Sequence, residues 1–139
     1  MIVDIKQFIQ ENDVLKSNSL IEASTINDVE NTIGIKVGKQ LIEYITTYGY
    51  LIFEAVELYG ITARQGIEES DMVKQTLYLH KYFPGTKGYI ALENQGDGDY
   101  YIVDSTDTVY EFISEQDKLN NTGLKLFDYI IKRFEEAKG

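Results

Sequence analysis

The chain has 139 residues, of which 43% are hydrophobic, and a formal net charge of −10 at pH 7. This length suits a single domain with its own core, and the absence of cysteine excludes disulfides, thiolate zinc sites and a cysteine nucleophile. The acidic balance argues against nucleic acids and anionic membranes as partners, because those bind surfaces rich in lysine and arginine.

The first half of the chain is predicted to be mainly helical. Its start lacks the basic residues and the long apolar run of a signal peptide, and no apolar stretch reaches the length of a membrane span, so we expect a cytoplasmic protein. Apolar residues recur at helical spacing over 2–11, from about 25 to 34 and from about 37 to 49, with a polar loop between the first two helices. Ser24 or Thr25 is expected to cap the second helix.

The second half is predicted to contain most of the strands. Residues 50–59 suit two short strands with a break near Glu54, and Asp71 starts a helix that ends at Pro84. The remaining predicted elements are strands over about 88–93, 99–104 and 108–113 and a closing helix from about 122 to 137. Both faces of the strand at 99–104 are apolar, so we expect it to be central and covered on both sides.

The segment between Gly88 and Asp117 is strongly acidic. It has no lysine or arginine, and its acids are Glu93, Asp97, Asp99, Asp104, Asp107, Glu111, Glu115 and Asp117. A sheet with an acidic rim that carries tyrosines is well suited to bind a basic protein. The turn at 96–99 could be compared with a calcium loop, but the residue types at the first two ligand positions do not fit and strands flank it. We therefore interpret it as a glycine-containing hairpin turn.

Catalytic chemistry has weak support in the sequence. Asp97 and Asp99 are too close and too exposed to have well-separated pKa values, as a carboxylate pair in acid–base catalysis would need. His80 is the only histidine and is interpreted as structural or surface. We therefore assign no catalytic, cofactor-binding or metal-binding residue. A small hydrolase or a metal protein is kept as an alternative, ranked below the two binding functions that follow.

Several short motifs occur in the order found in the SMI1/KNR4, or SUKH, superfamily. They are Thr25-Ile-x-x-Val-Glu30, Gly34-Ile35, Tyr44-x-x-x-Tyr48-Gly49, Glu57-Leu-Tyr-Gly60, the strand pair around Gly96-Asp-Gly-Asp99, Val109-Tyr-Glu-Phe112 and Phe127-Asp-Tyr-Ile130. The chain resembles this superfamily over about residues 20–135. The resemblance implies a single α+β domain over 1–139, with a central, mostly antiparallel sheet flanked by N-terminal helices, one mid-chain helix and a C-terminal helix.

The resemblance also implies a function. Many bacterial members look like immunity proteins, which bind and neutralise a toxin, often the nuclease domain of a polymorphic toxin. We expect a cytoplasmic, non-enzymatic immunity protein whose partner is a basic toxin; the runner-up is a regulatory scaffold that docks other proteins. The oligomeric state stays open. The expected partner-binding residues are Glu54, Glu57, Tyr59, Asp97, Asp99, Tyr100, Asp104 and Asp107.

Overall fold

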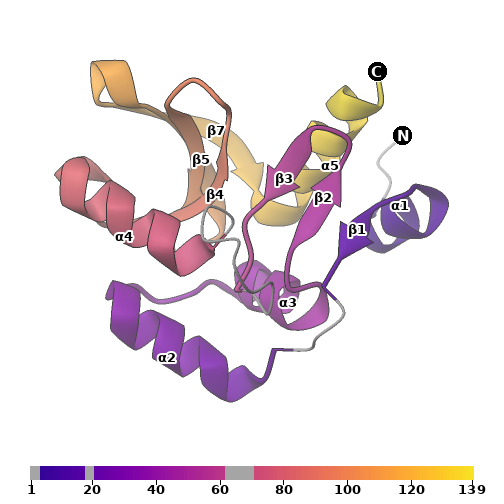
Figure 1. Cartoon of the computed structure of the whole chain (residues 1–139), viewed down its shortest axis with the longest axis horizontal. Helices are drawn as coiled ribbons and strands as arrows, with labels where there is room; N and C mark the ends of the chain where they lie inside the picture. Colours follow the sequence, from indigo (N-terminus) through magenta and orange to yellow (C-terminus); the bar gives the residue numbers. More distant parts are fainter. Residues whose placement is uncertain (1–3, 18–20, 62–70) are drawn as a thin grey trace.

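A computed structural model describes residues 4–17, 21–61 and 71–139 (Figure 1). The secondary-structure elements follow the chain in the order α1 (Ile5–Glu11), β1 (Leu15–Lys16), α2 (Ala23–Ile33), α3 (Lys39–Thr47), β2 (Leu51–Phe53), β3 (Val56–Leu58), α4 (Met72–Tyr82), the 3-10 turn η2 (Pro84–Thr86), β4 (Ile90–Asn94), β5 (Asp99–Val103), β6 (Thr108–Ile113), the 3-10 turn η3 (Ser114–Gln116), β7 (Lys118–Lys125) and α5 (Leu126–Lys138). The predicted α+β class is confirmed.

The described strands form two antiparallel sheets, of order β1-β2-β3 and β4-β5-β6-β7, where the sequence had predicted one central sheet. The two sheets approach each other where Tyr59 N–H donates to the Leu92 carbonyl at 2.7 Å. β3 ends at Leu58, one residue before this hydrogen bond, so no strand pairing continues along β4. The smaller sheet therefore stands beside the larger one (Figure 1).

The four-stranded sheet is covered on both faces, as predicted for its middle strand. Phe83, at the end of α4, packs against Phe112 with ring centroids 5.1 Å apart. On the opposite face, Tyr129 of α5 packs against Tyr101 with centroids 4.9 Å apart. β5 lies between β4 and β6, which confirms that it is an interior strand.

Two details of the N-terminal half differ from the prediction. α2 begins at Ala23 with Glu22 as its N-cap, so the proposed caps Ser24 and Thr25 lie inside the first turn and do not cap it. The predicted polar loop contains β1, in which Leu15 pairs with Ile52. Two residues are too short a run for alternation to signal a strand, and the pairing partner is remote in sequence.

The closing helix is also shorter than predicted, because β7 occupies the chain up to Lys125. β7 is an edge strand whose residues are polar or partly exposed, so it has no apolar alternation to mark it. Thr122 Oγ1 donates to the Val109 carbonyl at 2.7 Å, and the register shifts between Thr108 and Tyr110. Pairing with β6 therefore makes this segment a strand, although its own sequence pattern does not predict one.

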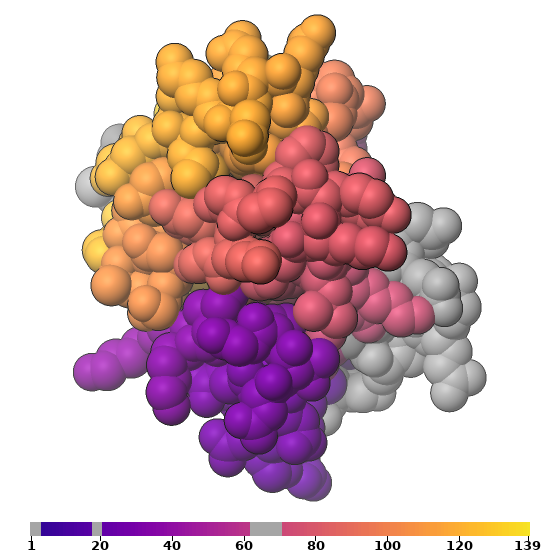
Figure 2. All heavy atoms as spheres, turned by 90° about the vertical axis from the view of Figure 1, so that its left-hand side faces the viewer, coloured from indigo at the N-terminus to yellow at the C-terminus, as the bar shows by residue number. Residues whose placement is uncertain are grey.

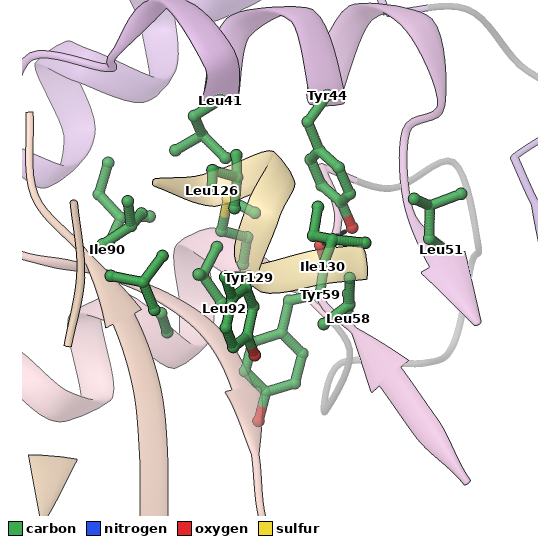
Figure 3. Close-up of a cluster of buried hydrophobic side chains, with 14 of the residues drawn as sticks. Leu41, Tyr44, Leu51, Leu58, Tyr59, Ile90, Leu92, Leu126, Tyr129 and Ile130 are labelled. Carbon is green, nitrogen blue, oxygen red and sulfur yellow. Dashed lines mark hydrogen bonds between the residues drawn. The ribbon is translucent and has the colours of Figure 1, made fainter. Parts of the chain in front are cut away.

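The core joins the small sheet to α3 and α5 (Figure 3). The buried Tyr44 hydroxyl donates to the Tyr59 carbonyl at 2.8 Å. At the next residue, a Cβ on Gly60 would lie 2.1 Å from the Gly49 carbonyl oxygen, so the chain passes too close for any side chain. This close approach explains why the Leu-Tyr-Gly motif has glycine at its third position.

Candidate partner-binding surface

The turns between β4 and β5 and between β6 and β7 lie together at one end of the large sheet. Asp99 pairs with Ile113 in the β5–β6 register, and Asp99 Oδ1 accepts a hydrogen bond from Ser114 N–H at 3.3 Å. Asp97, Glu115 and Asp117 are exposed in these two turns. We call Asp97, Asp99, Glu115 and Asp117 the acidic end; it lies at the top of Figure 1.

Local hydrogen bonds hold the first of these turns. Gly96 and Gly98 have φ values of 95° and 91°, which suit glycine. The Asn94 side chain accepts from Gly96 N–H at 2.7 Å, and Asp97 Oδ1 accepts from Asp99 N–H at 3.2 Å. Among the described residues, no group of three or more histidine, cysteine, aspartate or glutamate side chains is arranged to hold a metal ion. The acids of this turn are therefore presented on an ordered backbone.

Glu54 and Glu57 lie on the β2–β3 hairpin of the small sheet. Glu54 is exposed in the turn itself with a φ of 53°, and Glu57 is exposed in the middle of β3. Figure 1 shows this hairpin turn at the same upper end of the molecule as the acidic end. The structure thus places Glu54 at the same end of the molecule as Asp97 and Asp99, although the two sheets are distinct.

Asp104 and Asp107 lie at the opposite end of the sheet, where they organise the backbone. Asp107 is buried, and its carboxylate accepts from Gln40 N–H at 2.9 Å and from Leu41 N–H at 3.1 Å. It therefore caps α3 from 67 positions away in sequence. Asp104 Oδ1 accepts from the backbone N–H of Thr106 and of Thr108. The structure therefore does not join these two acids to Asp97 and Asp99 on one surface.

Replacing Asp107 with alanine is expected to lower the free energy of unfolding by about 2 kcal/mol, because two N–H groups at the start of α3 would lose their acceptor. Urea denaturation of the two proteins measures the difference. Asp28→Ala, at an exposed position of α2, is the control and should change stability by less than about 0.5 kcal/mol. Equal stability of Asp107→Ala and the parent chain would contradict the capping role.

Tyr59 and Tyr100 are buried, with 5% and 7% of their surface exposed. Burial raises the pKa of the Tyr59 hydroxyl, and the nearby Tyr100 and Glu57 raise it further. Burial also raises the pKa of Tyr100, with a smaller contribution from Tyr78 of α4. Both tyrosines are therefore mainly part of the packing between the two sheets and α4.

An exposed aromatic surface on α4 was not predicted. Tyr78 and Tyr82 are 47% and 56% exposed, their ring centroids are 5.0 Å apart, and Leu77 beside them is 41% exposed. Lys81 Nζ lies 5.3 Å from the Tyr82 ring. The missed signal was that Met72, Thr76 and Leu79 already complete the buried face of this helix.

Glu93, one of the eight acids of the segment 88–117, is not a surface residue. It is 2% exposed and accepts hydrogen bonds from the Tyr129 hydroxyl and from Arg133, whose Nε and Nη2 lie 2.7 and 3.0 Å away. The hydrogen bond to Glu93 raises the pKa of Arg133. Burial, and then the negative charge of Glu93, raise the pKa of Tyr129. Glu93 and Arg133 therefore form an internal ion pair, and the Tyr129 hydroxyl is a further donor to Glu93.

Two further features bear on small-molecule and membrane functions. A pocket beside Arg133, lined also by Tyr101 and Tyr129, has a volume of about 50 Å³. Sites for small-molecule ligands usually begin at about 300 Å³. His80 is engaged with the backbone, since its Nε2 lies 2.8 Å from the Tyr89 carbonyl oxygen. None of the helices in the described part of the chain is long and apolar enough to cross a bilayer.

The chain matches a known protein-family model. No curated protein is similar enough to the chain to serve as a relative. An SMI1-KNR4 cell-wall family model of the SUKH type matches residues 2–134. This match covers nearly the whole chain and extends beyond the segment in which the motifs were recognised. The chain therefore belongs to the SMI1-KNR4 family.

Proposed function

We propose that this chain is an immunity protein that binds and neutralises a cognate toxin, whose expected type is a basic nuclease domain of a polymorphic or contact-dependent system. The observation that carries the proposal is the acidic end, where four acids occupy two adjacent turns of one sheet. Family membership supports it, because many bacterial relatives look like immunity proteins. Inhibition would be stoichiometric and non-catalytic, in the cytoplasm of the producing cell.

The physical argument starts from the toxin. A nuclease holds a phosphate backbone with lysine and arginine side chains, so its substrate-binding surface is positive. A rigid negative surface attracts that region over several ångströms, accelerates encounter and favours the docking orientation that covers it. The net charge of −10 adds a general attraction for a basic toxin. The ordered hairpin turns concentrate part of this negative charge at one end of the molecule.

The structure changes which of the predicted residues we assign to contact with the toxin. Asp97, Asp99 and Glu54 remain on the proposed surface, and Glu115 and Asp117 join them. Glu57 lies on the same hairpin as Glu54. The backbone hydrogen bonds of Asp104 and Asp107, and the burial of Tyr59 and Tyr100, give these four structural roles, so we no longer assign them to contact with the toxin.

Reversing the charge in Asp97→Lys/Asp99→Lys is expected to slow association with the toxin by about tenfold or more and to flatten the salt dependence of the association rate. Stopped-flow or surface plasmon resonance measurements at several salt concentrations test this. The matched control is Asp28→Lys/Glu43→Lys, which makes the same change in net charge on exposed positions of α2 and α3. Asp97→Asn/Asp99→Asn removes the charge while keeping side-chain acceptors for the turn.

An association rate that falls equally in the control and in the Asp97/Asp99 variant would assign the effect to net charge alone and remove the acidic end from the proposal. The toxin itself is sought by co-expressing the chain with the product of the neighbouring gene. Rescue of growth together with a co-purifying complex supports immunity. A complex without rescue would instead favour the alternative function, a regulatory scaffold that docks a protein without neutralising it.

The exposed aromatic surface of α4 is the observation that keeps the scaffold alternative open. It lies outside the acidic end, and its tyrosines are of the type that dominates many binding interfaces. A scaffold would need such a second surface, whereas an immunity protein needs only the one that covers the toxin.

A further inference from the structure

α4 and the turn that follows it differ in charge from the rest of this acidic chain. Residues 72–88 include Lys74, Lys81 and Lys87 and no aspartate or glutamate, whereas the next segment, up to Asp117, has eight acids and no lysine or arginine. Among the described residues, the exposed large hydrophobic side chains are Leu15, Leu77, Tyr78 and Tyr82, of which only Leu15 lies outside α4. Positive charge and exposed apolar surface thus coincide on one helix.

This surface lies next to the acidic end. A Cβ built on Gly85, in η2 directly after α4, would be 3.9 Å from the Asp117 carboxylate. Phe83 and Phe112 pack together just below this point, with ring centroids 5.1 Å apart. Figure 2 shows α4 across the middle of one face of the molecule, with the residues of the β6–β7 turn directly above it. One face therefore presents an acidic patch and a basic aromatic patch side by side.

Two complementary patches on one face suit a two-fold symmetric dimer, because residue i then contacts j of the second copy while j contacts i. We propose that this chain self-associates through this face, with the outer surface of α4 against the η3 turn of a second copy. Lys81 of one copy then pairs with Glu115 of the other, and the Tyr78–Tyr82 pair is covered at the centre of the interface.

A second copy suits this face by both charge and surface type. The lysines of α4 would meet Glu115 of η3 and Asp117, which follows it. The tyrosine rings lose water on association, which is the usual source of affinity at interface centres. The net charge of −10 on each copy opposes association, so we expect a reversible dimer in the micromolar range. The proposal does not rest on the immunity function and is tested with the purified chain alone.

Sedimentation velocity from low micromolar to near-millimolar concentration tests the proposal. The parent chain is expected to shift reversibly from monomer to dimer as concentration rises. Tyr78→Ala/Tyr82→Ala should weaken the dimer by about tenfold or more, since exposed interface tyrosines are removed while alanine preserves the helix. The matched control is Leu15→Ala on β1, which removes the most exposed large hydrophobic side chain among the described residues and should leave the dimer unchanged.

A charge exchange tests the pairing itself. Lys81→Glu and Glu115→Lys should each weaken the dimer, and the double variant should recover most of the lost affinity, because the two charges would again be opposite across the two-fold axis. A parent chain that stays monomeric at every concentration would overturn the proposal. So would a dimer that the Tyr78/Tyr82 variant leaves intact, or a double charge variant that recovers nothing.

Discussion

Replacing Arg133 with alanine is expected to lower the free energy of unfolding by about 3 kcal/mol or more, among the largest effects of any single substitution in this chain. The side chain of Glu93 is 3% exposed, and Arg133 supplies the cation that compensates it through two hydrogen bonds. Without the guanidinium, an uncompensated carboxylate would remain between β4 and α5. Urea denaturation monitored by circular dichroism measures the loss.

Two further variants separate the buried charge from other causes. Lys132→Ala alters the exposed neighbouring position on α5 and should cost less than about 0.5 kcal/mol. Glu93→Gln/Arg133→Met removes both charges and should be clearly more stable than Arg133→Ala, because no unpaired ion is left inside. If the stability loss of the double variant instead equals the sum of the losses of Glu93→Gln and Arg133→Met measured singly, the ion pair is not the source of the effect.

Replacing Phe134 with alanine is expected to cost about 4 kcal/mol, the range found for buried phenylalanine truncations. Phe134 is fully buried, and its ring centroid lies 5.6 Å from that of Phe8 and 5.4 Å from that of Phe53. These three rings join α1 and the small sheet to α5. Truncation would open a cavity at the point where three elements of the fold meet.

The same denaturation experiment tests the Phe134 prediction, with Leu15→Ala as an exposed large-to-small control that should change stability far less. Because α1 is held to α5 by this cluster, hydrogen exchange of α1 should accelerate more than that of β5. A loss below about 1 kcal/mol would mean that the neighbouring rings close the space, and that the cluster does not anchor α1.

Local sequence signals predicted those elements whose own residues carry a strong pattern. The stripe of apolar residues correctly predicted the helix α3, although this helix begins at Lys39 and ends at Thr47, inside the predicted range of about 37–49. The left-handed Gly34 ends α2 as predicted. Both signals depend on residues only a few positions apart. The break at Glu54 between β2 and β3 was correct for the same reason. β1 and β7 were missed because their strand character comes from pairing with remote residues.

The candidate surface was predictable in part. Position in the Gly96–Asp99 turn was enough to place Asp97 and Asp99 together at an exposed hairpin. It was not enough for Asp107, whose carboxylate binds the backbone of α3, or for Glu93, which pairs with Arg133 on α5. Both of these acids have partners at least 36 positions away, so no local pattern could distinguish them from exposed acids.

By itself the sequence determined the acidic charge, the lack of cysteine chemistry, the order of most elements and the family signature, because composition and short-range periodicity carry these properties. Only the tertiary structure decided which acids face solvent, where the two sheets separate, and that α4 turns a pair of tyrosines outward. The physical reason is that burial and charge compensation depend on segments that meet only after folding, so identical carboxylates become an exposed patch, a helix cap or half of an internal ion pair.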